Sequence, residues 1–176
     1  MAPDSLITRL THRLFGAPLL RNSIRGEYVE EMVAAALEPE WALCAGDWGA
    51  CDLKELGGPL RIQVKQSAAR QSWHSADSPP PRPRFSIAHK AGRYEGGTAW
   101  IAEPGRNAEI FIFGWHPVTD ASADHRDPDQ WRFFVVAEAE LPATASIGLP
   151  TLARVAQPVA HTELAARVAH LVASLR

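Results

Sequence analysis

The sequence has few cysteines and no long hydrophobic run, and each shortage excludes a class of protein. Only Cys44 and Cys51 occur among 176 residues, which is too few for a disulfide framework, and their spacing matches no zinc motif. No apolar run approaches the about 18 residues of a membrane span, and no signal-peptide hydrophobic region begins the chain. We therefore expect reduced core cysteines in a cytoplasmic protein that makes no membrane contact.

Global disorder is also excluded by composition. Hydrophobic residues make up 46% of the chain and charged residues 22%, which is the balance of a globular protein with a buried core. The length fits one domain of ordinary size. We expect a single domain over residues 1–176, with a helical extension at about 1–22.

The net charge of −2 is small, but charge is unevenly distributed. Residues 61–93 carry a local balance of +6, and the rest of the chain carries −8. A basic strip on an acidic chain is typical of a localised phosphate-binding face, although a basic loop without a partner would give the same pattern. The strip consists of Arg61, Lys65, Arg70, Arg82, Arg84, Lys90 and Arg93 against Asp77.

Hydrophobic periodicity predicts both helices and strands. Ser5 is a suitable N-cap for a short amphipathic helix over 5–15, and a second helix is expected from Ile24 to Glu38, ending before Pro39. A third helix is expected over 162–175. Strands are expected at 41–45, 50–54, 60–65, 84–88, 108–115 and 131–137. This order predicts an α/β or α+β fold with a central mixed sheet flanked by helices.

The segment R61-I-Q-V-K65 raises a question about function. In a strand, Ile62 and Val64 point to one face while Gln63 and Lys65 point to the other. Such a polar row is either a solvated face or one side of an active site. In the preceding strand, the same alternation places Asp52 on the face opposite Cys51 and Leu53. A tight meander would therefore bring Asp52 beside Gln63 and Lys65.

An additional acid is expected from the helix that precedes these strands. At about 100° per residue, most of its glutamates lie opposite the apolar arc, where solvation explains them. Glu30 instead falls beside Leu37 at the edge of the buried arc, from which it can point into a cleft next to the sheet. We select Glu30 as the helix acid, with Glu27 as the alternative.

Taken together, these residues resemble the PD-(D/E)XK, or restriction-endonuclease-like, nuclease superfamily. The matching residues are Glu30, Asp52, Gln63 and Lys65, and the similarity extends over roughly residues 22–155. The runs Q63-V-K-Q-S-A, Q71-S-W, W131-R-F-F-V-V and S146-I-G-L are similar to a bacterial branch with a Q-x-K motif. The resemblance implies a restriction-endonuclease-like core and a DNA endonuclease whose products carry a 5′-phosphate and a 3′-hydroxyl.

The resemblance also implies a metal site. Carboxylates of Asp52 and Glu30, the amide oxygen of Gln63 and the backbone carbonyl of Val64 would suit Mg²⁺, which activates water for phosphodiester hydrolysis. Lys65 would stabilise charge that develops on the phosphate. Gln63 replaces an acid of the superfamily, so metal affinity should fall and Mn²⁺ is an alternative cofactor. A protein that keeps the fold only for nucleic-acid binding or assembly is the second hypothesis.

Contacts with DNA are expected around the catalytic strand and the basic loop. We assign nucleic-acid binding to Gln66, Ser67, Arg70, Arg82, Arg84, Lys90 and Arg93, which would contact the phosphate backbone without base specificity. Trp73 is interpreted as a core or packing residue rather than a base-stacking platform. Because double-strand cutters of this superfamily often pair two active sites, a homodimer is a further hypothesis.

Other sites in the sequence are weaker. The linker between the last two strands contains a group of potential metal ligands, but its acids fit no calcium-loop pattern, so a solvated connection is expected there. The group consists of His116, Asp120, Asp124, His125, Asp127 and Asp129. No G-x-S-x-G elbow, P-loop or dinucleotide fingerprint occurs.

Overall fold

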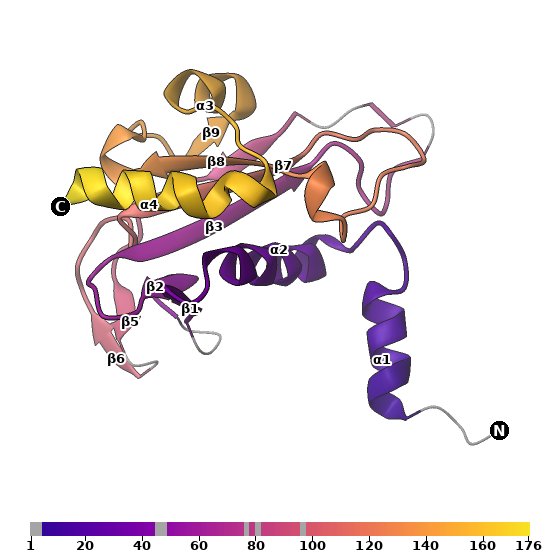
Figure 1. Cartoon of the computed structure of the whole chain (residues 1–176), viewed down its shortest axis with the longest axis horizontal. Coiled ribbons are helices and arrows are strands. Elements are labelled where there is room, and N and C mark those ends of the chain that lie inside the picture. The colour runs from indigo at the N-terminus through magenta and orange to yellow at the C-terminus, as the bar shows by residue number, and fades with distance from the viewer. Residues whose placement is uncertain (1–4, 45–48, 76–77, 80–81, 96–97) are drawn as a thin grey trace.

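The computed structural model describes residues 5–44, 49–75, 78–79, 82–95 and 98–176 (Figure 1). Its α-helices are α1 (Leu6–Phe15), α2 (Asn22–Leu37), α3 (Leu149–Val155) and α4 (Leu164–Leu175). Its strands are β1 (Trp41–Leu43), β2 (Leu53–Glu55), β3 (Arg61–Ala68), β4 (Arg84–Ser86), β5 (Arg93–Glu95), β6 (Ala99–Ile101), β7 (Ile110–His116), β8 (Arg132–Ala137) and β9 (Ser146–Gly148). Short 3₁₀ turns lie at Pro128–Gln130, Glu138–Glu140 and His161–Glu163.

Five strands form the central sheet in the order β1-β2-β3-β7-β8. The first three are an antiparallel meander, as the sequence predicts. Strand β3 then runs parallel to β7 over seven residue pairs, and β8 closes the sheet antiparallel to β7. The fold is therefore a mixed sheet with helices packed on it, and the predicted α+β class is confirmed.

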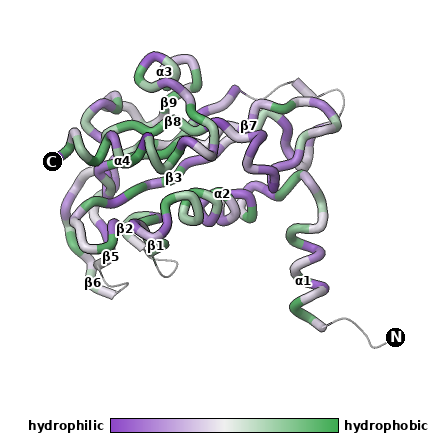
Figure 2. The backbone as a smooth tube through the Cα atoms, viewed as in Figure 1, coloured by the Kyte–Doolittle hydropathy of each residue, from purple (hydrophilic) through white to green (hydrophobic). Residues whose placement is uncertain are grey.

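One face of the sheet is covered by α2 and α4 (Figure 1). Buried side chains of α2, among them Val29 and Val33, pack against Ile62 and Val64 of β3 and Ile112 of β7. Figure 2 shows hydrophobic residues along β3, β8 and α4, where these elements lie close together. Helix α2 ends at Leu37 before Pro39, as expected, because proline disfavours helical backbone in the residue before it.

A second cluster covers the opposite face. Phe111 and Phe113 of β7 pack there with Phe85, Ile87 and Ile147. The strand expected at 84–88 is shorter, covers Arg84–Ser86 and does not join the central sheet; it pairs instead with β9. Helix α3 and strands β5, β6 and β9 were not predicted from the sequence.

Helix α1 begins as predicted, with the Ser5 hydroxyl accepting a hydrogen bond from the Thr8 backbone N–H. None of its residues is buried. Its C-terminal end is fixed by the Phe15 carbonyl, which accepts a hydrogen bond from Arg126, and by the Phe15 ring, whose centroid lies 6.0 Å from that of Tyr28. No helix within the described residues has the length and hydropathy needed to cross a membrane.

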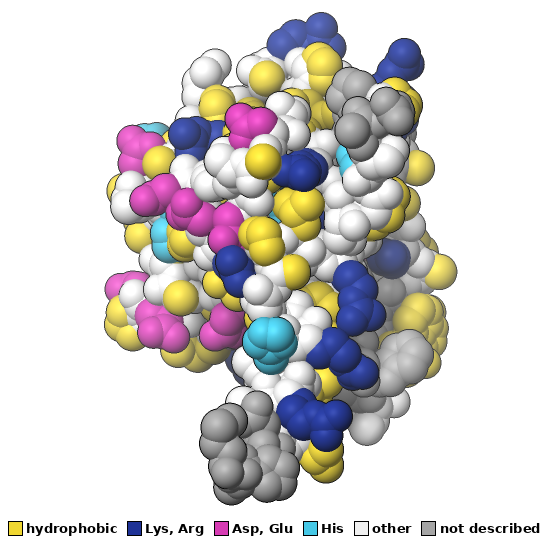
Figure 3. Space-filling view, turned by 90° about the vertical axis from the view of Figure 1, so that its right-hand side faces the viewer, with side chains coloured by type: hydrophobic (Ala, Val, Ile, Leu, Met, Phe, Trp, Pro, Cys, Tyr) yellow, Lys and Arg dark blue, Asp and Glu magenta, His cyan; other side chains and the backbone are white. Residues whose placement is uncertain are grey.

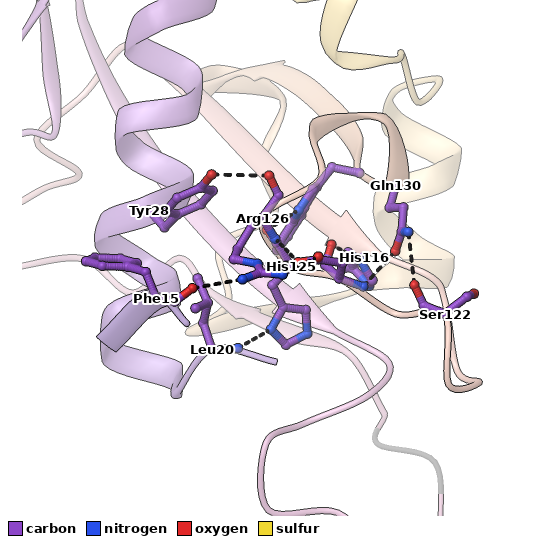
Figure 4. A network of polar contacts seen from close by, with 10 residues as sticks. Phe15, Leu20, Tyr28, His116, Ser122, His125, Arg126 and Gln130 are labelled. Atoms are coloured by element: carbon purple, nitrogen blue, oxygen red, sulfur yellow. Dashed lines mark hydrogen bonds and ion pairs between the residues drawn. The ribbon is translucent and has the colours of Figure 1, made fainter. Parts of the chain in front are cut away.

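The linker between β7 and β8 is not the solvated connection expected from its sequence. His116 and His125 are both 0% exposed. The Leu20 backbone N–H donates to His125 Nδ1 over 3.0 Å, and His125 Nε2 lies 3.0 Å from the Arg70 carbonyl (Figure 4). His125 therefore attaches the linker to the segment before α2 and to the segment after β3, whereas His116 contacts the Asp124 carbonyl within the linker. The expectation of a solvated connection was wrong for these two histidines, because the contacts of His125 join residues far apart in the sequence, and it holds for the exposed Asp120 and Asp129.

Candidate functional site at the open edge of strand β3

Asp52 ends the pairing between β2 and β3. Its backbone N–H donates to the Ile62 carbonyl over 3.0 Å. Its carboxylate then takes the place of a backbone partner, because Oδ2 accepts the Val64 N–H over 2.6 Å and also accepts from the Gln63 amide. Strand β2 consequently begins at Leu53 rather than at residue 50. The edge of β3 is open beyond this point.

The backbone carbonyl of Val64 points toward the same open edge. In a strand, the N–H and C=O of one residue point to the same side. Because the Val64 N–H donates to Asp52, its carbonyl is also directed toward β2 rather than into the ladder with β7. The carbonyl and the Asp52 carboxylate thus lie at one edge, as a shared ligand site requires.

Helix α2 contributes acidic groups to this region. Glu30 is half-buried, Glu27 is exposed, and both line a pocket together with Asp52. Burial, followed by the negative charges of Asp52 and Glu27, raises the pKa of Glu30 to about 7. Burial is also the main cause that raises the pKa of Asp52. The two carboxylates repel one another in this cleft.

Lys65 lies next to Gln63 on the face of β3 opposite Ile62 and Val64. Burial lowers the pKa of the Lys65 ammonium, while the charges of Asp52 and Glu30 act in the opposite direction. The ammonium is therefore a desolvated cation close to both acids. This is a suitable environment for stabilising an additional negative charge.

The site offers oxygen donors of the kind that Mg²⁺ and Mn²⁺ prefer: two carboxylates, one amide oxygen and one backbone carbonyl. These residues fit a hard divalent cation, which would relieve the repulsion between Glu30 and Asp52. The Gln63 amide now donates its N–H to Asp52, so ligation through its oxygen requires the amide to rotate. Across the described part of the chain, no three His, Cys, Asp or Glu residues are grouped to hold a metal.

Two grooves meet at Lys65. The first, which we call the hairpin groove, has a volume of about 650 Å³ and extends from Asp52, Gln63 and Lys65 toward β5 and β6. The second, which we call the helix groove, has a volume of about 620 Å³ and extends along the start of α2. Lys65 lines both grooves, so a ligand that passes from one to the other crosses the candidate site.

The predicted DNA-binding residues are divided between these grooves. Gln66, Ser67 and Arg84 line the helix groove, whereas Lys90 and Arg93 line the hairpin groove. Two predicted residues line neither: the Arg70 guanidinium donates to the Asp120 carbonyl, and Arg82 is exposed on the loop before β4. Figure 3 shows Lys and Arg side chains gathered along one side of the face that carries α1, with Asp and Glu along the other.

Trp73 is not the core residue expected from the sequence. Its side chain is 65% exposed, and it lines the helix groove. Its ring meets His74 edge-on with centroids 6.1 Å apart. The interpretation as a packing residue was wrong because neighbouring sequence does not reveal whether a second element covers the indole.

Arg25 was missed entirely. It is 1% exposed, and its guanidinium donates to Gln66 over 2.6 Å, to Gln71 over 2.8 Å and to Asn22 over 2.8 Å. Burial lowers its pKa to about 10, so it remains a cation at neutral pH. The sequence held one indication: Arg25 occurs one turn before Val29, on the helix face that carries the apolar arc.

Comparisons with known proteins give one distant structural neighbour. The chain is similar in structure to a bacterial homing endonuclease, I-Ssp6803I, with a TM-score of 0.39 and 15% sequence identity over 73% of this chain and 77% of that one. No protein-family model matches the sequence, and no curated protein matches it. The residues of the site, rather than this similarity, therefore support the function proposed below.

Proposed function

We propose that this protein is a metal-dependent DNA endonuclease that uses Mg²⁺ or Mn²⁺ to hydrolyse phosphodiester bonds. The observation that carries the proposal is the meeting of Glu30, Asp52, Gln63 and Lys65 at the open edge of β3. These residues come from α2, the turn before β2, and β3. Their chemistry combines oxygen donors for a cation with a nearby ammonium for a phosphate.

Each residue has a distinct part in this proposal. Asp52 and Glu30 hold the cation through carboxylate oxygens, and Gln63 and Val64 complete the set through an amide and a backbone carbonyl. A divalent cation bound there lowers the pKa of a coordinated water and neutralises phosphate oxygens. Lys65 donates to the scissile phosphate and stabilises the charge that develops on it.

DNA contacts follow from the grooves on either side of Lys65. Lys90 would neutralise phosphates in the hairpin groove and Arg84 in the helix groove, whereas the Arg93 guanidinium is paired with Glu103 and must leave that carboxylate to contact a phosphate. Because backbone contacts release counterions, we expect binding that weakens as salt concentration rises. These contacts position the strand and carry no base specificity.

The direct test is cleavage of supercoiled plasmid and single-stranded DNA by the purified wild-type chain with Mg²⁺ or Mn²⁺. We expect nicked or shortened products that disappear when EDTA is added. Cleavage that continues unchanged in EDTA would contradict metal dependence.

A second candidate function is nucleic-acid binding without cleavage. Gln63 favours it, because an amide in place of an acid removes one negative charge from the metal site. Under this alternative, wild-type protein binds DNA in a salt-dependent manner but cleaves neither substrate with either metal. Replacing Gln63 by Glu would then be expected to raise metal affinity.

The repulsion between the two acids predicts a measurable effect on stability. Because its folded-state pKa is raised from 4.5 to about 7, Glu30 costs stability as the pH rises through about 7. At pH 8 and without metal, we expect Glu30→Gln to be more stable than wild type by up to about 3 kcal/mol in unfolding free energy, and therefore to unfold at a higher temperature. At pH 5 this difference in stability should disappear.

Differential scanning fluorimetry with and without Mn²⁺ measures this effect. Metal should stabilise the wild type by mass action and should stabilise Glu30→Gln less. Glu40→Gln is the control, because Glu40 is exposed just beyond the end of the same helix and lines neither the acidic pocket nor either groove. Equal behaviour of Glu30→Gln and Glu40→Gln would contradict the assignment of Glu30.

A further inference from the structure

Trp73 leaves a large aromatic surface uncovered inside the helix groove. Its exposure of 65% is unusual for a residue whose burial would contribute strongly to folding. The loop that carries it directly follows β3, which bears Lys65. The indole therefore lies in the same groove as the candidate catalytic lysine.

Other polar groups in this groove suit a sugar and a phosphate. Ser67 and Ser86 offer hydroxyl groups and Arg84 offers a guanidinium, whereas the Gln66 amide is already bonded to Arg25 and Asn22. The volume of about 620 Å³ lies within the range of sites for small organic ligands. An aromatic ring beside polar groups is the combination that binds a nucleotide: the ring contacts the base, and the polar groups contact the backbone.

Arg25 supplies positive charge at the wall of the helix groove. Its three hydrogen-bond partners are the neutral amide oxygens of Gln66, Gln71 and Asn22. None of these partners carries a charge that balances the guanidinium. Glu27 and Glu30 also line the groove, so a phosphate bound there would be held by Arg25, Lys65 and Arg84 against the repulsion of these two acids.

We propose that the helix groove binds a nucleotide whose base is unpaired and stacks on Trp73. Since a base inside a duplex is already stacked between its neighbours, it must leave the helix to reach the indole. The preferred substrate class is then single-stranded DNA, or duplex DNA with an unpaired nucleotide beside the scissile phosphate. This inference rests on the proposed nuclease function for its substrate, but the binding it predicts is measurable without cleavage.

The test is fluorescence anisotropy of a labelled oligothymidylate and of a labelled hairpin duplex in EDTA. We expect Trp73→Ala to weaken oligothymidylate binding about tenfold, in line with the usual contribution of one stacked base, and to leave duplex binding within experimental error. Trp73→Phe should restore most of the loss. Leu175→Ala is the matched control, because Leu175 is 41% exposed at the end of α4 and lines neither groove.

The outcomes separate the two proposals. If Trp73→Ala weakens single-stranded and duplex binding equally, or weakens neither, the stacking site is overturned. Metal-dependent cleavage by the wild type would still support the nuclease in that case. Loss of oligothymidylate binding in Trp73→Ala, together with a wild type that cleaves nothing, would support the stacking site and reject the nuclease.

A different observation carries a second inference, concerning α1. This ten-residue helix buries none of its side chains, and Leu6, Ile7 and Leu10 are 80%, 75% and 44% exposed. An isolated helix of this length is marginal in water unless its apolar face is covered. Arg9 and Arg13 lie on the same face as Leu6 and Leu10 and line a shallow hollow with them.

A complementary groove lies at the other end of α2. Trp41, Leu43 and Leu56 give it an apolar floor, and Glu31 and Glu38 give it an acidic rim. Leu43 and Leu56 are 39% and 56% exposed. Helix α1 is fixed beside the start of α2 and is directed away from this groove in its own chain (Figure 1).

We infer that α1 of a second copy occupies this groove, with its leucines on the apolar floor and its arginines against the glutamates. Each copy offers both surfaces, and a reciprocal exchange of α1 between two copies would form a symmetric dimer. Sedimentation velocity should show a dimer that Leu6→Asp/Leu10→Asp weakens at least about tenfold. Leu175→Asp is the control, because it places the same charge on an exposed leucine elsewhere.

Charge reversal makes the test specific. Arg9→Glu/Arg13→Glu should weaken self-association, and mixing it with Glu31→Lys/Glu38→Lys should restore a mixed dimer. Because no residue of α1 is buried, the α1 variants should keep the circular dichroism of the folded chain. A wild type that remains monomeric at high concentration, or a dimer that survives Leu6→Asp/Leu10→Asp, would overturn the inference.

Discussion

Lys65→Ala and Asp52→Ala are each expected to reduce metal-dependent DNA cleavage by at least about 10²–10³-fold, the usual cost of removing one preorganised charge from a reacting phosphate or carbonyl. Among the described residues, Lys65 is the cation that lines both grooves next to the two acids. Its low-dielectric position strengthens its interaction with a phosphate. Asp52 contributes the carboxylate that also fixes the edge of β3.

The two variants should differ in their effects on folding. Lys65→Ala removes a desolvated charge and leaves no hydrogen-bond partner behind among the described residues, so its unfolding temperature should change little. Asp52→Ala leaves the Val64 N–H without its acceptor, and a loss of about 1–3 kcal/mol is expected. Asp52→Asn keeps an oxygen for that N–H while removing the charge, and thereby separates the catalytic effect from the structural one.

Lys54→Ala provides the matched control for cleavage. Lys54 lies on β2 next to the site, but its side chain is exposed. It should cleave at the wild-type rate. Activity that survives both Lys65→Ala and Asp52→Asn would mean that another site, or another protein in the preparation, cleaves the DNA.

The parts of the fold that the sequence predicted depend on local rules. The Ser5 cap and the end of α2 before Pro39 each depend on residues within one helical turn. The alternation along β3 depends only on the two-residue period of a strand. The meander that brings Asp52 beside Gln63 joins elements separated by a short turn, so its pairing was also predictable.

The parts that were missed depend on long-range contacts. Strand β4 pairs with β9, about 60 residues later in the chain, and no local pattern links the two. Arg25 is buried because Gln66 and Gln71 lie opposite it, 41 and 46 residues away. Trp73 is exposed because nothing within the described residues covers it, which a sequence cannot show. The helix groove, which these residues line, was therefore not predictable from the sequence. The position of Lys65 on the polar face of β3, at the end of this groove, was predictable.

Trp131→Ala should destabilise the protein by about 3–5 kcal/mol, the usual cost of removing a fully buried tryptophan. Trp131 is 0% exposed, and its indole N–H donates to the His125 carbonyl over 3.0 Å. Its ring lies 5.1 Å from that of His116 and 6.4 Å from that of Phe133, measured between centroids. It thus joins the linker before β8 to the core under α2.

Equilibrium urea unfolding at pH 7.5 measures this loss, and two variants divide it into parts. Trp131→Phe keeps most of the buried area but leaves the His125 carbonyl without its donor, so we expect a loss of about 1–3 kcal/mol. Trp73→Ala removes an indole that is 65% exposed and should stay within about 0.5 kcal/mol of wild type. A Trp131→Ala protein as stable as Trp73→Ala would mean that the linker does not pack on the core through this residue.

Acidification should also weaken the packing of the β7–β8 linker on the core, because His125 in this linker is buried in its neutral form. Burial is the main cause that lowers the pKa of His125 to about 4, so the folded protein binds fewer protons than the unfolded chain between about pH 4 and 6.5. The contribution of His125 is therefore complete above pH 6.5 and is lost as the pH falls through this window. Because protonation of Glu30 acts in the opposite sense, the comparison is made between Glu30→Gln and Glu30→Gln/His125→Gln. The difference between their unfolding free energies should shrink from pH 7.5 to pH 4.5, and a difference independent of pH would contradict a neutral, buried His125.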